Sequence, residues 1–364
     1  MENNRKKILI LTNHSYMLYR FRKELIEELM KDNEVVLSMP FVGHHDDFIN
    51  MGLRCIETKL ERRGINPITD LSLVKFYKKM LKEEKPDLVI TYSIKPNIYG
   101  GLMCSKLNIP FYANVQGLGT AFQKQGLAQF VTMLYKAAFK RVQTVFFENR
   151  ENADEFVKRN IISPQRETIL KGAGINLCEY EYRPYPANEK PHFLYLGRIM
   201  KEKGMDELFE ASEKLYNEGE SFVLDLVGFF EDEYKEKVSR LEERGIVKFH
   251  GFQEEPRPYY AAADCIVMPS YHEGMSNVNL EASATGRPVI TSDIPGCKEA
   301  VEDGKTGWLC KAQNADSLYN KMKLFLGESV SRREEMGRLA RKKMENEFDK
   351  ALVVESTINA LKVL

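Results

Sequence analysis

Short apolar runs rich in β-branched residues alternate along the chain with longer segments of helical periodicity. The apolar runs predict strands at 8–12, 34–39, 87–92, 144–149, 192–197, 222–228, 265–269 and 288–292. Between them, apolar residues recur at helical spacing, as in 21–31 and 205–219, which predicts amphipathic helices. Strands that alternate with helices are typical of parallel sheets covered by helices on both faces. The pattern therefore predicts an α/β fold.

The segment YEYRPYPANEKP, residues 180–191, interrupts this alternation, because it is polar, bears prolines and has no helical periodicity. The chain has 364 residues, whereas a single core stops growing efficiently beyond roughly 250–300 residues. We therefore expect two Rossmann-like, doubly wound domains, residues 1–182 and 183–345, and a last segment, residues 346–364. Ligands of such sheets bind beyond the carboxyl ends of the strands, so we expect the active site in a crevice between the domains.

The composition, 43% hydrophobic and 29% charged, is that of an ordinary globular protein. The six cysteines lack short paired spacings, which favours reduced thiols in the cytoplasm over disulfides or a zinc site. No segment approaches the roughly 20 apolar residues that span a bilayer, and the apolar run after MENNRKK is too short for a signal sequence. We therefore expect a cytoplasmic protein that is not integral to a membrane.

The net charge of zero hides an asymmetry between the two halves. Residues 1–180 hold 27 Lys and Arg against 20 Asp and Glu, and residues 181–364 hold 26 against 33, so the halves carry +7 and −7. A basic half favours anionic lipid or phosphate partners. Ordinary solvated surface charge is the alternative.

The segment LYLGRIMKEKGMDEL, residues 194–208, combines a strand end, a glycine and several cations. The predicted strand ends at Gly197, the loop beyond it carries Arg198, Lys201 and Lys203, and a helix follows. A glycine at a strand end lets the backbone approach a ligand, and two or three cations beyond it suit a diphosphate. Solvated lysines on an ordinary loop are the alternative, but the place at a strand end favours a phosphate site.

The segment EGMSNVNLEASATGRPVITSD, residues 273–293, continues a predicted buried strand through a loop into a helix. The backbone N–H groups at the start of that helix, near Ser276 to Asn279, predict an anion cradle. Glu281 falls on the first turns of the helix and Glu273 on the loop before it, so the two carboxylates can bind different hydroxyls of one ligand. Two solvated glutamates are the alternative.

E-G-M-S-N-V-N-L-E-A, with G-R-I-M-K-E-K-G upstream and S-D-I-P-G-C-K-E-A-V-E-D-G-K-T-G-W-L downstream, resembles the retaining GT-B glycosyltransferases of family 4, whose motif is E-x7-E. The resemblance covers residues 192–310 closely and the rest loosely. It implies that Glu281 holds the ribose hydroxyls of a nucleotide, that Glu273 contacts the donor sugar, and that Arg198 and Lys203 neutralise the departing diphosphate. Its other implied donor-binding residues are Gly197, Gly274, Met275, Ser276, Asn277 and Val278.

The resemblance implies that no metal is required and that no cofactor is used, since the nucleotide sugar is a substrate. Metal-dependent glycosyltransferases usually carry D-x-D, a triplet this sequence lacks. HHDD, residues 44–47, is better interpreted as a polar surface loop than as a metal site. Two nucleotide motifs are incomplete: a P-loop ending at Thr306 lacks its first glycine, where Glu299 stands, and the glycine pair at 117 and 119 is followed by Phe122 instead of a third glycine.

Residues 92–122 resemble the sub-group that extends polyprenyl-diphosphate-linked sugars in bacterial capsule, O-antigen or glycan assembly. Lys95, Asn97 and the loop 114–120, with Gln116 and Gly117, lie at predicted strand ends, where they are candidates to hold an acceptor sugar or its diphosphate. Structural turns are the alternative. The turn after the first strand has no glycine from Thr12 to Leu25, and we group its candidate contacts with the acceptor site: Asn13, His14 and Ser15. No general base is assigned.

Residues 120–141 form an apolar helix candidate with a basic end, either on a membrane surface or as a covering helix of the first domain. The region after 331 is helical and charged on one face, and the resemblance implies that the final helix crosses back to the first domain.

We therefore expect a retaining, metal-independent hexosyltransferase. It would move a hexose or N-acetylhexosamine from a nucleotide sugar, with UDP as the expected nucleotide, to a polyprenyl-diphosphate-linked saccharide. Its place would be the cytoplasm, with peripheral binding to the cytoplasmic surface of the inner membrane, and we expect no nucleic-acid partner. A UDP-sugar epimerase of related fold and a non-catalytic sugar-nucleotide-binding subunit are the alternatives.

Overall fold

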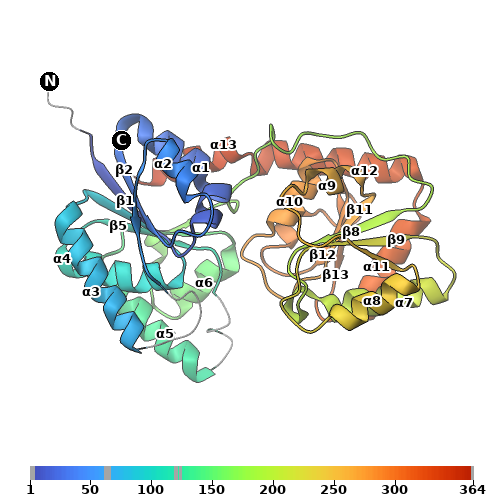
Figure 1. The fold of residues 1–364 in the computed structure, drawn as a ribbon, viewed down its shortest axis with the longest axis horizontal. Coiled ribbons are helices and arrows are strands. Elements are labelled where there is room, and N and C mark those ends of the chain that lie inside the picture. The colour runs from blue at the N-terminus through green and yellow to red at the C-terminus, as the bar shows by residue number, and fades with distance from the viewer. Residues whose placement is uncertain (1–4, 61–66, 119–121, 123–124, 362–364) are drawn as a thin grey trace. The chain divides into compact units, whose positions relative to one another are not determined.

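The computed structural model describes residues 5–60, 67–118, 122 and 125–361. The chain forms two compact units, which are the parts shown in Figure 1. Unit 1 comprises Met1–Ala173 and Leu352–Leu364, and unit 2 comprises Gly174–Ala351. The predicted α/β class is confirmed, because each unit is a parallel sheet covered by helices.

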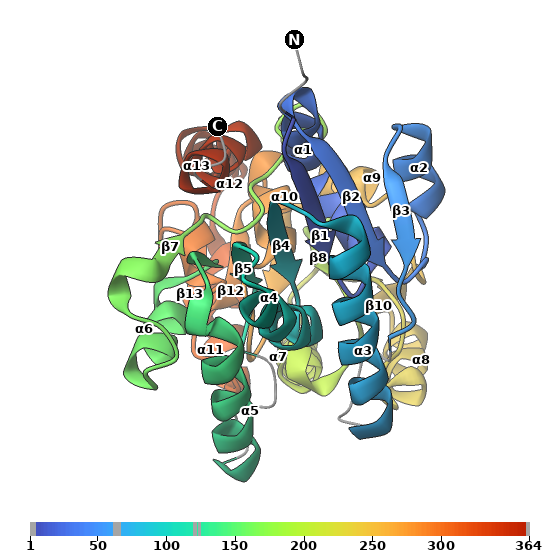
Figure 2. The ribbon, with the colours of Figure 1, turned by 90° about the vertical axis from the view of Figure 1, so that its left-hand side faces the viewer.

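Unit 1 is built on a seven-stranded parallel sheet of order β3-β2-β1-β4-β5-β6-β7, which Figure 2 shows with β7 at the left and β3 at the right. Its strands are β1 (Lys7–Leu11), β2 (Glu34–Met39), β3 (Arg54–Glu57), β4 (Leu88–Tyr92), β5 (Phe111–Val115), β6 (Thr144–Phe147) and β7 (Glu167–Ile169). Its α-helices are α1 (Ser15–Asp32), α2 (His45–Asn50), α3 (Pro67–Glu84), α4 (Gly101–Leu107), α5 (Gln125–Ala138), α6 (Arg150–Lys158) and most of α13 (Lys350–Leu361). Shorter turns are the π-helical η1 (Pro96–Gly100) and the 3₁₀ turns η3 (Phe139–Arg141) and η4 (Pro164–Arg166).

The alternation of side chains along each strand divides unit 1 into two cores. On β1, Ile8 and Ile10 face one core, whereas Leu9 and Leu11 face the other. Helices α1, α2 and α13 cover the first face, and α3, α4, α5 and α6 cover the second. The central strands are therefore mainly apolar on both faces, as a parallel sheet with helices on both sides requires.

Unit 2 repeats this architecture with a six-stranded parallel sheet of order β10-β9-β8-β11-β12-β13. Its strands are β8 (His192–Leu196), β9 (Val223–Val227), β10 (Val247–Phe249), β11 (Cys265–Met268), β12 (Val289–Ser292) and β13 (Gly307–Cys310). Its α-helices are α7 (Met205–Asn217), α8 (Lys235–Glu243), α9 (Arg257–Ala262), α10 (Asn277–Ala284), α11 (Ala315–Gly327) and α12 (Val330–Lys343). Its 3₁₀ and π-helical turns are η5 (Lys201–Lys203), η6 (Lys298–Ala300) and η7 (Met344–Phe348). Helices α7, α8 and α11 cover one face, and α9, α10 and η7 cover the other.

The units meet in sequence at Ala173 and Gly174, whereas the sequence analysis placed the division after residue 182. The segment between these positions packs on unit 2: the N–H of Ile175 donates to Phe348 O over 2.7 Å, and Tyr180 joins the core beside α9. The second division follows residue 351, so the end of α12, η7 and the start of α13 belong to unit 2. Composition marks the polar segment 180–191, but it does not reveal that this segment is anchored.

Arg287 is the anchor of that segment. Its side chain is fully buried, and its guanidinium donates to the carbonyls of Arg183 (2.9 Å) and Pro184 (2.8 Å). It also donates to four carbonyls near the ends of α9 and α10, those of Tyr260, Ala261, Thr285 and Gly286. Burial lowers the pKa of Arg287 to about 10, so the group stays charged at neutral pH and the carbonyls replace its water shell.

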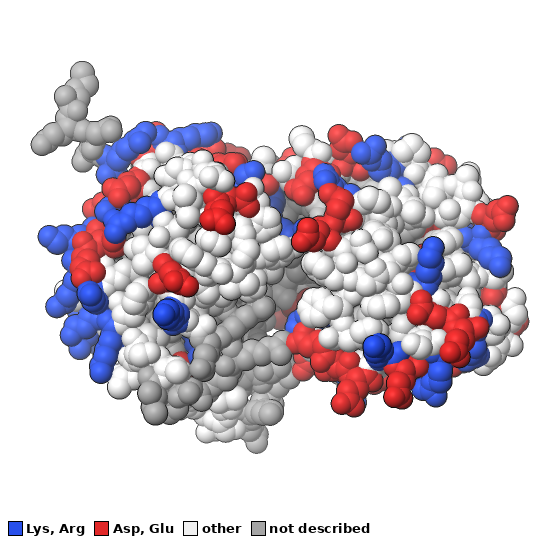
Figure 3. Space-filling view, in the orientation of Figure 1, with Lys and Arg blue, Asp and Glu red and all other residues white. Residues whose placement is uncertain are grey.

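Charge is distributed unevenly over each unit. Figure 3 shows Lys and Arg gathered over the α3–α4 side of unit 1 and Asp and Glu over the α7–α8 side of unit 2. Within the described ranges, no helix combines the length and apolar character that crossing a bilayer needs.

Each sheet reverses its strand order at one point, between β1 and β4 in unit 1 and between β8 and β11 in unit 2. At such a point the loops after adjacent strands diverge to opposite faces and leave space beyond the carboxyl ends, which is where doubly wound sheets bind ligands. The donor-side candidates and most of the acceptor-side candidates lie at these two places.

Candidate functional site

The switch point of unit 2 starts with two closely apposed glycines. Gly197 follows β8 and Gly228 follows β9, and each has a φ of 153°. A Cβ added to Gly228 would lie 1.8 Å from Gly197 O, so no larger residue fits there without moving the backbone. This packing brings the loop after β8 close to the loop after β9.

Two cations follow Gly197, and each one pairs with a carboxylate. Arg198 Nη1 lies 2.7 Å from Glu231 Oε2, and Lys203 Nζ pairs with Glu273 Oε1. The same Glu273 oxygen accepts a hydrogen bond from Ser270 Oγ at 2.8 Å. The structure thus brings together Lys203 and Glu273, which lie far apart in sequence, at the carboxyl ends of β8 and β11.

Gly204 makes this meeting possible. It has a left-handed φ of 75°, and a Cβ there would lie 2.1 Å from Pro269 O. The chain therefore turns from η5 into α7 directly against the loop after β11. This close approach places Lys203 beside Glu273.

Tyr195 lies beneath the charged groups. It is fully buried, and its hydroxyl donates to the carbonyl of Arg198 over 2.6 Å. Burial raises its pKa above the usual range, the Glu273 carboxylate raises it further, and Arg198 opposes the rise. Because both charges act on one hydroxyl, Arg198 and Glu273 lie in one local electrostatic environment. Arg198, Lys203 and Glu273, together with Glu231, follow the carboxyl ends of β8, β9 and β11, and we call these four residues the charged cluster.

The N-terminus of α10 completes the donor-side candidates. The N–H of Ser276 donates to Gly296 O over 2.7 Å, and the Ser276 side chain caps the helix by accepting from the N–H of Asn279. Within the described part of the chain, the N–H groups of Asn277 and Val278 make no hydrogen bond. These two donors, with the positive end of the helix dipole, are what a phosphate could bind.

The side chains of the remaining donor-side candidates serve the fold. Met275 is 6% exposed and packs in the core beside α9. Val278 is partly buried and packs against the cores on both faces of the unit 2 sheet. Gly274 is fixed from behind, because a Cβ on Gly296 would lie 2.4 Å from Gly274 O. At Gly274 and Met275 the backbone, not a side chain, is available to a ligand.

Glu281 lies on α10 and is only 5% exposed. Its Oε2 accepts a hydrogen bond from the hydroxyl of Tyr260 at 2.8 Å, and Tyr260 itself is fully buried on α9. A carboxylate held in this way is ordered before any ligand arrives. Sequence reasoning did not find Tyr195, Glu231, Ser270 or Tyr260. Glu231 and Tyr260 reach their partners from separate elements, whereas Tyr195 and Ser270 lie three residues from theirs, at positions that no motif marks.

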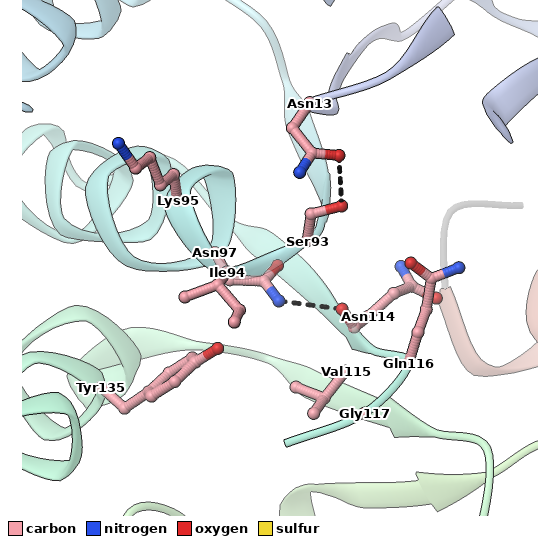
Figure 4. Close-up of a pocket in the computed structure, with 10 residues that line it drawn as sticks. All are labelled: Asn13, Ser93, Ile94, Lys95, Asn97, Asn114, Val115, Gln116, Gly117 and Tyr135. Carbon is pink, nitrogen blue, oxygen red and sulfur yellow. Dashed lines mark hydrogen bonds between the residues drawn. The ribbon is translucent and has the colours of Figure 1, made fainter. Parts of the chain in front are cut away.

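The switch point of unit 1 holds a cavity of about 220 Å³. Its described lining residues follow β1, β4 and β5, with one from α5: Asn13, Ser93, Ile94, Lys95, Asn97, Asn114, Val115, Gln116, Gly117 and Tyr135. Figure 4 shows these side chains around the open space. The structure thus brings together five of the acceptor-side candidates, namely Asn13, Lys95, Asn97, Gln116 and Gly117.

Buried hydrogen bonds fix the cavity wall. The hydroxyl of Thr91 donates to Asn97 Oδ1 (2.6 Å), and Asn97 Nδ2 donates to the carbonyl of Asn114 (2.8 Å). The hydroxyl of Ser93 donates to Asn13 Oδ1 over 2.8 Å. Figure 4 draws the two bonds whose partners both line the cavity, namely Ser93–Asn13 and Asn97–Asn114.

The other acceptor-side candidates lie elsewhere. Ser15 is fully buried; its hydroxyl donates to Gly43 O and accepts from the N–H of Val42, each over 2.8 Å, so it holds the loop after β2. His14 precedes α1, with its ring 6.1 Å from that of Tyr16. Gly119 and Thr120 lie outside the described residues.

In HHDD, His44 Nδ1 lies 2.6 Å from Asp47 Oδ2. The described ranges contain no group of three or more His, Cys, Asp and Glu side chains placed to hold a metal ion.

Comparison with known proteins matches both units to glycosyltransferase models. The family model "Glycosyl transferases group 1" matches residues 182–343, and the model "Glycosyl transferase 4-like" matches residues 7–149. The N,N'-diacetylbacillosaminyl-diphospho-undecaprenol α-1,3-N-acetylgalactosaminyltransferase of Campylobacter jejuni is 28% identical over 90% of this chain and 91% of its own length. The capsular polysaccharide biosynthesis glycosyltransferase CapM of Staphylococcus aureus is 26% identical over 79% of this chain and 80% of its own.

Solved structures show the same fold. HepE from Anabaena, determined with UDP and glucose, aligns with a TM-score of 0.81 at 17% identity over 99% of this chain and all of its own. Sucrose-phosphate synthase from Thermosynechococcus elongatus aligns with a TM-score of 0.78 at 20% identity over 98% of each chain. Two doubly wound Rossmann-like units of this kind define the GT-B fold. The chain belongs to the GT-B glycosyltransferases of the bacterial glycan-assembly type.

Proposed function

We propose that the protein transfers a hexose or N-acetylhexosamine from a UDP-linked donor to a saccharide carried on a polyprenyl diphosphate, with retention at the anomeric carbon. The donor part is supported by the charged cluster and the α10 N-terminus in unit 2. The acceptor part is supported by the Campylobacter relative, whose name specifies an undecaprenyl-diphosphate-linked sugar. CapM is named as a glycosyltransferase of capsular polysaccharide biosynthesis, which also supports transfer to a saccharide.

The pairing of Lys203 with Glu273 is the observation that carries the proposal. A nucleotide sugar offers one group to each partner: its phosphate oxygens accept from the ammonium, and its sugar hydroxyls donate to the carboxylate. Both charges therefore keep a partner when the donor replaces their mutual contact. An ordinary surface ion pair, by contrast, contributes little and is mostly solvated, whereas these side chains are 17% and 15% exposed.

The bond that breaks joins the anomeric carbon to the diphosphate, which departs with the electron pair as the sugar becomes oxocarbenium-like. Arg198, Lys203 and the free N–H groups of Asn277 and Val278 would stabilise the departing charge. In this proposal Glu281 binds the ribose hydroxyls, and the departing phosphate accepts the proton of the acceptor hydroxyl. The cations and the helix N-terminus would stabilise the departing diphosphate without a metal ion, so treatment with EDTA should leave turnover unchanged.

We also propose that unit 1 binds the cytoplasmic membrane surface peripherally. Helix α5 covers the sheet with Val131 and Tyr135, but it turns Phe130 (42% exposed) and Met133 (63% exposed) outward. Basic residues follow at the end of this helix: Lys136, Lys140 and Arg141. Apolar side chains beside cations are what an anionic lipid surface binds.

The deciding experiment offers a panel of nucleotide sugars together with short-chain lipid-diphosphate saccharides. Product mass identifies transfer, and proton NMR of the new anomeric centre identifies retention. Glu281→Gln should weaken UDP binding in calorimetry at least about tenfold, since hydrogen bonds to a charged group contribute about 1.5–3 kcal/mol. Glu334→Gln, an exposed change on α12, is the matched control.

The alternatives give different results in the same assay. An epimerase converts the donor sugar without any acceptor. A non-catalytic subunit binds UDP tightly but yields no product with any acceptor. Equal UDP affinity in Glu281→Gln and wild type would contradict the donor-site assignment.

A further inference from the structure

The cavity in unit 1 offers no uncompensated cation among its described lining residues. Lys95 is its one lysine or arginine within that lining, and Lys95 Nζ lies 2.8 Å from Asp70 Oδ1. These side chains are 12% and 8% exposed, and the other oxygen of Asp70 accepts from the Tyr99 hydroxyl over 2.9 Å. In Figure 4 the ammonium points away from Asn114 and Gln116. Because Tyr99 also holds Asp70 and the ammonium is turned away from the carboxamides, a diphosphate beside Asn114 and Gln116 would meet no cation among the described lining residues.

One side of the cavity presents carboxamides. Asn114 is 3% exposed and donates to Thr91 O over 3.3 Å, while its amide oxygen accepts no hydrogen bond from the described residues. The carboxamide of Gln116 makes none within the described chain either, and in Figure 4 it lies beside Asn114. Both the oxygen and the nitrogen of the Asn97 amide are hydrogen-bonded within the protein. Asn97 therefore positions Asn114, and Asn114 and Gln116 are left to bind a ligand. Amides offer both a donor and an acceptor, which suits a neutral polar ligand.

The other side is mainly apolar, formed by Ile94, Val115 and the ring of Tyr135, whose hydroxyl also points into the cavity. Tyr135 is 2% exposed and belongs to the core under α5. The volume of about 220 Å³ is below the ~300–1,000 Å³ typical of drug-sized ligands. The cavity therefore has room for about one sugar ring with a small substituent.

The backbone around the cavity is unusual in two places. Ser93 has a left-handed φ of 75°, although it is not glycine, and its hydroxyl is bonded to Asn13. The π-helical turn η1 follows within three residues. Such conformations cost energy and cluster at ligand sites, where the surroundings enforce them.

We propose that this cavity is the subsite for an uncharged, acetamido-bearing sugar at the end of the acceptor, and that the acceptor diphosphate binds outside it. This rests on the proposed function and specifies the acceptor class. An acetamido group has three parts: its N–H donates to Asn114 Oδ1, its carbonyl accepts from the Gln116 amide, and its methyl group packs on the apolar side. A plain hydroxyl fills only part of this site.

A helix begins at Ile94, directly after Ser93, so its N-terminus lies at the cavity wall. Its dipole favours an electronegative atom, which the acetamido carbonyl supplies, but it would also favour a phosphate. The two ligands therefore have to be separated by experiment.

The test measures binding to the full-length protein, so it does not depend on turnover. The probes are the methyl glycosides of N-acetylglucosamine and of glucose, followed by ligand-observed NMR, with inorganic pyrophosphate as competitor. The acetamido glycoside should bind at least about tenfold more tightly than the glucoside, because the latter leaves buried amide groups unpaired. Pyrophosphate should not displace it.

Gln116→Leu should reduce the preference for the acetamido glycoside to about threefold or less. Asn114→Leu, a second variant, should do the same. Gln165→Leu, an exposed change in η4, is the matched control and should keep the wild-type preference. Circular dichroism identifies any variant that fails to fold, and Gln116 is the safer position because it is only half-buried.

Equal affinity for the two glycosides would overturn the proposal, as would displacement by pyrophosphate or wild-type binding in both leucine variants. A failure of the proposed function has a different signature: the acetamido glycoside binds as described, yet no nucleotide sugar yields a product.

Discussion

At the scale of single residues, the Lys203–Glu273 pair predicts how charge is handled during transfer. Lys203→Met should lower kcat about 10²–10³-fold, the effect of removing one preorganised group that stabilises developing charge. The donor affinity should fall less, because Arg198 and the α10 N-terminus still contact the diphosphate in the proposed site. Steady-state rates at saturating donor and acceptor, together with UDP calorimetry, measure the two effects separately.

Lys201→Met is the control for this prediction, because Lys201 is an exposed lysine on the same short turn. It removes the same charge from the same surface, so general electrostatic effects on the donor cancel in the comparison. Equal kcat values in the Lys203 and Lys201 variants would mean that the pair with Glu273 is structural.

Local patterns identify which residues lie at strand ends, but they do not identify what those residues contact. The glycine and cations after a predicted strand placed Arg198 and Lys203 correctly at the carboxyl end of β8. The same reasoning placed Ser15 after β1, yet its hydroxyl is used by the loop after β2. Tyr135 reaches the cavity from α5 through tertiary packing alone, and no spacing in the sequence signals it.

At the scale of elements, the predicted strands are present, and the missed strands are mainly short ones. β7 and β10 have three residues each, and β3 has four. Such runs are too short to show periodicity, and pairing with a longer neighbour defines them. β5 reads FYANV, where a buried asparagine interrupts the apolar run because it faces the cavity. The alternation of elements was therefore predictable, and the edges of the sheets were not.

Arg287 links three elements, which predicts a stability effect far from the charged cluster. Arg287→Met removes the donor to six carbonyls, three of them in buried hydrogen bonds and three in partly buried ones. Each buried carbonyl left without a partner costs about 1–3 kcal/mol. We expect the free energy of unfolding of unit 2 to fall by several kcal/mol, measured by urea titration.

The control for this loss is Arg338→Met on α12, where the side chain is 68% exposed. Exposed ion pairs contribute about 0–1 kcal/mol, so this variant should unfold near the wild-type midpoint. If both variants unfold at the wild-type urea concentration, then the linker and the ends of α9 and α10 do not depend on the guanidinium.

At the scale of the whole molecule, the donor-side and acceptor-side candidates lie in different units. One unit is a single continuous segment of the chain, and the other is made of two segments. The donor-side candidates all lie between residues 174 and 351, a single continuous segment. Unit 1 holds the acceptor-side cavity but is discontinuous, since a helix from the end of the chain, α13, covers one face of its sheet. Val353 and Leu361 of α13 are 5% and 1% exposed and pack in the core with Ile8 and Leu25.

This division predicts that the two units behave differently when they are expressed separately. Residues 174–351 should fold alone and bind UDP within about tenfold of the full-length affinity, because all the proposed donor contacts are present, but they should transfer no sugar. Residues 1–173 lack α13 and expose the apolar surface it covers, which destabilises a small core. Joining residues 350–364 to this fragment through a flexible linker should restore cooperative thermal unfolding. A folded fragment 174–351 without UDP affinity would show instead that nucleotide binding depends on residues of unit 1.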